Sequence, residues 1–356
     1  MGQSEDEKPE TAKSSGLRYT FIVALTQLWR GPARRRNPSC NVPGSSNTLR
    51  LFFLSNPCLT FVEQEAAMKM RLVSLLWLVS SLAGTAQAQR VNDYLDVGVV
   101  TVKPEKRGEF EAIIKKMVDA NRKHQGDNWL TSEMMFGPGN TFTYVSPRQN
   151  YAGVEQAYGS FMGAMQKSLG PAAAAKLMQD FSNCLSSTRG EFRRRRWDLS
   201  ANAPTSESAM NQLVGQGRWL RTAIIRVRPG RGRDYEEQLR VVKQLREGAT
   251  NKTPTLVSQS VAGQSTTVYY ITNVVSSLGA LDTIPSLPDV LGEEGYKSYL
   301  KTVSEVVLST EINVSRIVPE LSHLNEAMVS VAPEFWRPKP PVAAKPKAAA
   351  AAETKP

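Results

Sequence analysis

The residues best suited to chemistry form an uninterrupted run of four arginines, Arg193–Arg196, with Trp197 directly after it. If this segment is a β-strand, successive side chains point to opposite faces, so Glu191, Arg193, Arg195 and Trp197 share one face. Guanidinium groups hold carboxylates and phosphates through two parallel hydrogen bonds. The run therefore has two interpretations, the protection of an exposed strand edge from aggregation and an anion-binding site.

A second group of candidates comprises Trp129, Tyr144 and His124. The two aromatic residues belong to apolar segments expected to form a hairpin, and His124 ends an amphipathic helical segment. Together they could frame a substrate. Core packing explains the aromatic residues equally well, and the dipole at the end of a helix explains a cationic His124, so both interpretations stay open.

Beyond residue 88 the sequence offers no basis for a metal or a cofactor. This part of the chain holds one cysteine, Cys184, and two histidines, with no ligand-spaced cluster. It contains no nucleophile elbow, phosphate-binding loop or dinucleotide fingerprint, and Gly230–Gly232 predicts a plain turn. Residues 1–88 carry ten of the 44 Lys/Arg and six of the 33 Asp/Glu, so the rest of the chain has a net charge of +7. Without an ordered basic and aromatic pattern, nucleic acid is not an expected partner.

Residues 68–88 have the three parts of a secretory signal peptide. Met68–Arg71 is basic, Leu72–Ala83 is apolar, and Ala86-Gln87-Ala88 offers a small-residue cleavage site. We therefore expect residues 1–67 to be a non-native or disordered extension, and the processed protein to have no integral membrane segment. A short membrane anchor or a buried helix is the alternative. Cys184 alone can form no internal disulfide, which favours a periplasmic or secreted bacterial protein.

The sequence repeats itself over about one hundred residues. Val97–Phe110 matches Thr222–Tyr235 at an offset of 125, and Leu130–Ser146 matches Leu256–Thr272 at 126, which places Tyr144 over Tyr270. Farther on, Ser186–Ser200 answers to Leu308–Ser322. In the last strands, Glu191, Arg193 and Arg195 are matched with Glu311, Asn313 and Ser315. A duplicated unit of this length predicts two tandem domains, at 89–200 and 218–322.

Each unit is expected to have the order β-α-β-β-α-β, the ferredoxin-like arrangement of the α+β class. The first comprises strand 94–103, helix 105–123, strands 129–136 and 141–146, short helical pieces over 151–168, a helix from Pro171 and strand 190–199. The second comprises strand 219–228, helix 233–249, strands 255–262 and 266–272, helix 289–309 and strand 311–318. Residues 201–217 are expected to be a polar linker, and 323–356 a short helix with a disordered Pro/Ala/Lys tail. The first strand of each unit is apolar on both faces, which predicts that the two sheets pack against each other with helices outside.

The repeated strand-Pro-turn-helix segments and the doubled order over residues 92–322 resemble the dimeric α/β-barrel superfamily, which includes antibiotic-biosynthesis monooxygenases and NIPSNAP-like proteins. The resemblance implies a pseudo-dimeric barrel made by one chain. It also implies a small-molecule cavity between sheet and helices or inside the barrel, without a cofactor in many members. Haem-degrading members use an Asn, a Trp and a His that have no convincing counterparts in this sequence.

The sequence thus favours an exported protein that binds a small organic ligand, anionic in character, in an amphipathic cavity. The alternative is a cofactor-independent monooxygenase-like or isomerase-like enzyme, and a structural role in the cell envelope is a third. No acid-base pair or nucleophile-base pair stands out in the sequence, which favours binding over catalysis.

Overall fold

The computed structural model describes residues 92–338 of the chain. The expected extension at 1–67, the expected signal peptide at 68–88 and the tail beyond Pro338 lie outside the described residues. The first half of the described part contains β1 (Tyr94–Val102), α2 (Arg107–His124), β2 (Leu130–Phe136), β3 (Thr141–Arg148), α3 (Tyr151–Leu169), α4 (Pro171–Asn183) and β4 (Leu185–Arg195). The second contains α5 (Glu207–Gln216), β5 (Trp219–Val227), α6 (Gly232–Gly248), β6 (Leu256–Ala262), β7 (Val268–Val275), α7 (Leu287–Val306) and β8 (Val307–Ile317). After η4 (Pro319–Leu321) come α8 (Glu326–Val329) and α9 (Pro333–Trp336).

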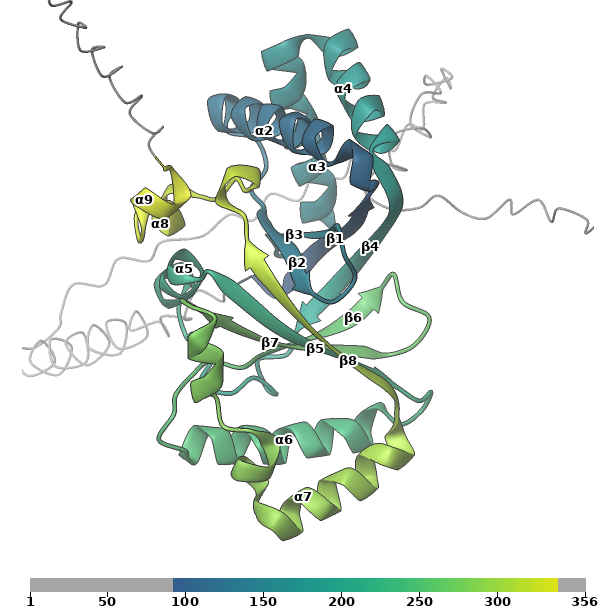
Figure 1. Cartoon of the computed structure of the whole chain (residues 1–356), viewed down its shortest axis with the longest axis vertical. Coiled ribbons are helices and arrows are strands. Elements are labelled where there is room, and N and C mark those ends of the chain that lie inside the picture. The colour runs from purple at the N-terminus through teal and green to yellow at the C-terminus, as the bar shows by residue number, and fades with distance from the viewer. Residues whose placement is uncertain (1–91, 339–356) are drawn as a thin grey trace, which may run out of the picture. The chain divides into compact units, whose positions relative to one another are not determined.

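The eight strands form one closed antiparallel barrel in the order β1-β3-β2-β8-β5-β7-β6-β4 (Figure 1). The two expected sheets therefore do not remain separate layers, because β2 pairs with β8 and β4 pairs with β6. Closure leaves β4 with a partner on each side, β1 and β6. The explanation of the arginine run as protection of a strand edge is therefore wrong.

Helices cover the outside of the barrel in two groups, each over its own core. Phe110, Phe142 and Phe181 lie at the centre of the first core, where α2, α3 and α4 pack on β1 and β3. Tyr235 and Tyr269 lie in the second, between α6 and the strands β5 and β7. None of the helices within residues 92–338 is long and apolar enough to cross a membrane.

The strand registers correct two of the residue matches drawn from the sequence. Gly98 pairs with Tyr144, and Ala223, its counterpart at the offset of 125, pairs with Ile271. Tyr144 therefore corresponds to Ile271 rather than to Tyr270, because the second hairpin connection is one residue longer. A slip of one residue turns a side chain to the other face of a sheet, so Tyr144 faces the helices and Tyr270 the barrel interior.

The match in the last strands is wrong by two residues. Leu95 pairs with Arg193 in the first unit. The residue that corresponds to Leu95 at the sequence offset of 125 is Leu220, and Leu220 pairs with Ser315. The amide of Arg195 donates to the Asp93 carbonyl, as the amide of Ile317 donates to the Arg218 carbonyl. Arg193 and Arg195 therefore correspond to Ser315 and Ile317, and Glu191 corresponds to Asn313.

Four elements differ from those expected. Residues 151–169 form one continuous helix instead of short pieces, begun by the Asn150 side chain, which accepts from the Gly153 amide. Strands β4 and β8 begin at Leu185 and Val307, several residues earlier than expected. The expected linker at 201–217 contains helix α5, whose cap is Ser206.

Candidate functional site

The interior of the barrel holds a cavity of about 540 Å³. Side chains from all eight strands line it, and Met210 and Val214 of α5 join them. The volume lies within the range of about 300–1,000 Å³ that is typical of small-molecule sites. Arg193, Arg195 and Trp197 all line this cavity, the two arginines on the inner face of β4 and Trp197 in the turn that follows the strand.

Arg193 is neutralised within the protein. Its guanidinium lies 2.7 Å from the carboxylate of Glu191, whose side chain is fully buried. The same carboxylate accepts from Arg189, from Gln264 and, at 2.6 Å, from the hydroxyl of Tyr270. Burial alone would raise the pKa of Glu191, but Arg193, the Tyr270 hydroxyl and Arg189 together hold it below its usual value.

Arg195 forms no ion pair with any residue of 92–338, and its buried Nη1 has no hydrogen-bond partner among them. Its guanidinium carbon lies 5.2 Å from the centre of the Trp197 ring. Burial lowers the pKa of Arg195 to about 10, against the opposing charge of Asp93, so the side chain stays cationic at neutral pH. Asp93 itself accepts from the Trp197 indole at 3.2 Å. Arg195 is thus a cation with an unused donor in the wall of the cavity.

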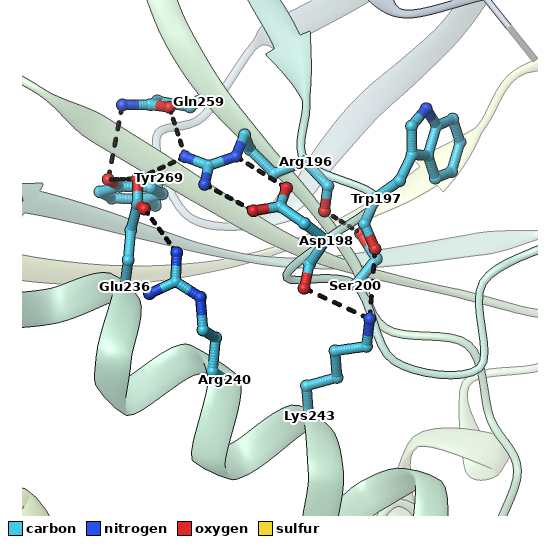
Figure 2. Close-up of polar contacts among 9 residues, drawn as sticks. All are labelled: Arg196, Trp197, Asp198, Ser200, Glu236, Arg240, Lys243, Gln259 and Tyr269. Carbon is cyan, nitrogen blue, oxygen red and sulfur yellow. Dashed lines mark hydrogen bonds and ion pairs between the residues drawn. The ribbon is translucent and has the colours of Figure 1, made fainter. Parts of the chain in front are cut away.

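The other two arginines of the run face away from the cavity. Arg194 is exposed, whereas Arg196 is bound on the outside of the barrel by Asp198, Glu236 and Gln259. Figure 2 shows these contacts between the end of β4 and helix α6, with the ring of Trp197 turned away from them. The Arg196 pair holds the pKa of Glu236 below its usual value. Arg196 therefore anchors α6, and the run divides into two inner and two outer residues.

A smaller pocket of about 70 Å³ lies between the first-half strands and helices. Trp129 and Tyr144 line it, together with apolar residues that include Ile114, Met117 and Phe161. The Tyr144 hydroxyl is buried without a hydrogen-bond partner, and burial raises the pKa of this phenol. The Trp129 indole is occupied, because it donates to the Leu321 carbonyl at 2.8 Å.

The wall of the same pocket contains an ionic cluster that the sequence analysis missed. Arg148 binds Asp127 through two hydrogen bonds, at 2.9 and 2.6 Å, and lies 3.4 Å from Asp96. Both carboxylates line the pocket. Burial raises the pKa of Asp96, opposed by Arg148. One signal in the sequence pointed to this cluster: an acidic residue in the otherwise apolar strand 94–102.

The structure does not bring the seven candidates into one site. Arg193, Arg195 and Trp197 line the barrel cavity with Glu191 behind them, whereas Trp129 and Tyr144 line the small pocket. His124 ends α2 and lines neither space, and its buried Nε2 has no partner among the described residues. Within residues 92–338, no group of three His, Cys, Asp or Glu side chains is placed to hold a metal ion.

No protein-family model matches the chain, and no curated protein matches its sequence. Solved structures match over about two thirds of it. A candidate monooxygenase from Lactobacillus acidophilus NCFM shares 11% identity over 64% of this chain and 93% of its own, with a TM-score of 0.37. An anthrone oxidase-like protein shares 14% identity over 65% of this chain and 93% of its own, with a TM-score of 0.43. A mutant chlorite dismutase from Candidatus Nitrospira defluvii shares 10% identity over 68% of this chain and 97% of its own, with a TM-score of 0.37. The described residues of this chain themselves form the closed antiparallel barrel that the resemblance noted in the sequence implies.

Proposed function

We propose that the protein binds a small organic anion inside the barrel, with Arg195 as the residue that pairs with it. The observation that carries the proposal is the unpartnered Nη1 of Arg195 in the wall of a 540 Å³ cavity. A buried charge without an ion-pair partner in contact is costly, and a ligand carboxylate or phosphate reduces that cost. Trp197 beside the guanidinium supplies a flat apolar surface for the organic part of the ligand.

The test is a thermal-shift screen of wild type, R195Q and R194Q against carboxylates and phosphates. R194Q is the matched control, since Arg194 belongs to the same strand but is exposed on the outside of the barrel. We expect anions to stabilise the wild type and R194Q alike, and to have no effect on R195Q. A wild type that responds to no anion, or an R195Q variant that responds equally, would overturn the proposal.

We also propose that the barrel consists of two tandem ferredoxin-like units that arose by duplication, at about 89–200 and 218–322. In support, β1 pairs with β3 and β4 as β5 pairs with β7 and β8, and a register shift falls at Thr101/Val102 and again at Arg226/Val227. The hairpin glycines Gly137 and Gly263 both have positive φ. Since each unit leaves two strand edges for the other, separately expressed halves should self-associate. A half that stays monomeric and unfolds cooperatively would contradict the proposal.

Export to the periplasm or the medium is part of the proposed function. It rests on the signal-peptide pattern at 68–88. The processed protein should begin at Gln89, and mass spectrometry of the exported protein checks this. Exported protein that retains residues 1–67 would show that the proposed start and cleavage site are wrong.

The small pocket supports a second candidate function, cofactor-independent proton transfer of the isomerase kind. Asp96, with its raised pKa, and the unpartnered hydroxyl of Tyr144 both face this pocket. The carboxylate can take a proton from carbon while the phenol donates one to the carbonyl oxygen, which yields an enol. The test is hydrogen-deuterium exchange of small 1,3-diketones followed by NMR. Wild type should accelerate exchange, and Y144F and D96N should each lose most of the acceleration. Equal exchange by all three proteins would exclude this candidate.

A further inference from the structure

The barrel cavity differs in polarity between its two ends. Strands β1 and β5 run in the same direction, since neighbouring strands are antiparallel and three strands separate them on either side. The end where both strands begin is lined by the apolar side chains Leu95, Leu130, Val145, Leu220, Leu256 and Val274, together with Arg193, Arg195, Trp197 and Ser315. The opposite end is lined by Thr101, Arg189, Arg226 and Glu311. A ligand in this cavity therefore meets an apolar surface at one end and a polar one at the other.

Arg195 lies at the apolar end. Its amide donates to the carbonyl of Asp93, the residue before β1, and its register partner Ser258 lies near the start of β6. The guanidinium with the unused donor thus lies at the end of the cavity that Leu95, Leu220 and Leu256 also line, with the Trp197 ring 5.2 Å away. At the polar end, Arg226 lies 3.6 Å from Glu311.

Helix α5 contributes to the wall of the cavity at the apolar end. It finishes at Gln216, three residues before β5 begins (Figure 1). Its residues Met210 and Val214 line the cavity. On its other side α5 is held by the segment that follows β8. The Trp336 indole donates to the Gly215 carbonyl at 2.9 Å, and a Cβ at Gly215 would lie 2.6 Å from Val331. The segment expected to be a linker therefore forms part of the cavity wall.

The charge at this end defines the ligand. Arg195 is a single cation, and the nearby Asp93 is bound to the Trp197 indole. A neutral ligand can accept a hydrogen bond from Nη1 but brings no counter-charge, whereas a dianion would add two negative charges beside a single cation that Asp93 already faces. A carboxylate forms an ion pair with the guanidinium, and an attached hydrocarbon chain packs against the aliphatic side chains of the cavity wall.

We infer that the ligand is an amphipathic monocarboxylate, whose carboxylate pairs with Arg195 and whose apolar body lies against Met210 and Val214 of α5. The inference rests on the proposed binding function and adds the class of ligand and the element that selects it. Met210 and Val214 are the specificity-determining residues of the cavity.

Isothermal titration calorimetry of the full processed chain tests the inference with acetate, hexanoate, decanoate, decanol and inorganic phosphate. Affinity should rise about threefold to fourfold for each added methylene that is buried. Decanol should bind at least tenfold more weakly than decanoate, and phosphate should not compete with it. M210S and V214S should each weaken decanoate at least fivefold and leave acetate unchanged. Q212S, on the exposed face of α5, is the matched control and should behave as wild type.

The outcomes separate the inference from the proposed function. Acetate and decanoate that bind equally well, both through Arg195, would overturn the inference and leave anion binding intact. Decanol or phosphate that binds as tightly as decanoate would overturn it as well. If M210S and V214S bind decanoate as tightly as the wild type does, α5 does not select the ligand. Thermal unfolding of each variant without ligand verifies that it is folded. A wild type that binds none of the acids, in a screen where other anions also fail, would overturn both.

Discussion

The guanidinium carbon of Arg195 lies 5.2 Å from the centre of the Trp197 ring, and its Nη1 has no partner among the described residues. Two residues earlier on the same face, Arg193 is bound to the buried carboxylate of Glu191 and lies over the Tyr270 ring. One strand thus carries a structural arginine and an available one side by side.

This difference predicts opposite effects on stability. R193Q removes a charged partner of the buried Glu191 and should lower the free energy of unfolding by about 1–3 kcal/mol. R195Q removes an unpaired charge, so it should change the free energy of unfolding by no more than about 1 kcal/mol, in the stabilising direction if at all. Urea denaturation of the unliganded proteins measures both. A larger loss in R195Q than in R193Q would show that Arg195 has a partner in the folded protein.

The pH dependence of stability should reflect Glu191. Its pKa in the folded protein is lowered from 4.5, so its ionic contacts stabilise the fold fully above that value. This contribution is lost as the pH falls through the lowered pKa. Wild type should therefore lose stability below about pH 4.5, and E191Q should lose less over the same range. Parallel curves for the two proteins would contradict the assignment.

Asp96 should act in the opposite sense. The pKa of Asp96 in the folded protein is raised from 3.8. Its contribution to the stability of the fold is therefore fully present below that value and is lost as the pH rises through the pKa of the folded protein. D96N should accordingly gain stability relative to wild type as the pH rises from acid to neutral. Arg148 keeps its two hydrogen bonds to Asp127 in this variant. Thermal unfolding of both proteins across this range checks the prediction.

A substitution in α5 tests how tightly this helix packs against the segment that follows β8. Alanine favours a helix over glycine, but a Cβ at Gly215 would lie 2.6 Å from the Val331 Cβ and 2.7 Å from the Met328 carbonyl oxygen. G215A should therefore lower the free energy of unfolding by about 1–3 kcal/mol. The control is G159A in α3, where a Cβ meets nothing within 4 Å, and it should raise stability by about 0.5–1 kcal/mol. Chemical denaturation distinguishes the two, and stabilisation by both would mean that α5 does not pack tightly on this segment.

The outer arginines should also differ from each other. R196Q leaves the half-buried carboxylate of Glu236 without its main partner and should lower the free energy of unfolding by about 2–4 kcal/mol. R194Q changes an exposed residue and should stay within about 0.5 kcal/mol of wild type. The two variants have the same charge change, so a calorimetric comparison isolates the anchoring of α6. Equal effects would contradict that role.

Local pattern was sufficient to predict the order of the eight strands, the long helices between them and the face on which each residue of the arginine run lies. Periodicity follows from backbone geometry, since side chains alternate along a strand whatever that strand pairs with. Helix α5 was missed because residues 201–217 carry few apolar residues, and its stability depends on packing against the barrel mouth and the segment after β8.

The sequence by itself determined that Arg193, Arg195 and Trp197 share one face and that Arg194 and Arg196 share the other. Only the tertiary structure decided that the first face encloses a cavity, that Glu191 neutralises Arg193 and not Arg195, and that Tyr144 and Tyr270 face opposite ways. It also brought Asp96, Asp127 and Arg148 together from three separate segments. The physical reason is that strand register and barrel closure depend on contacts between residues far apart in the chain, and a shift of one residue reverses which side of the sheet a side chain meets.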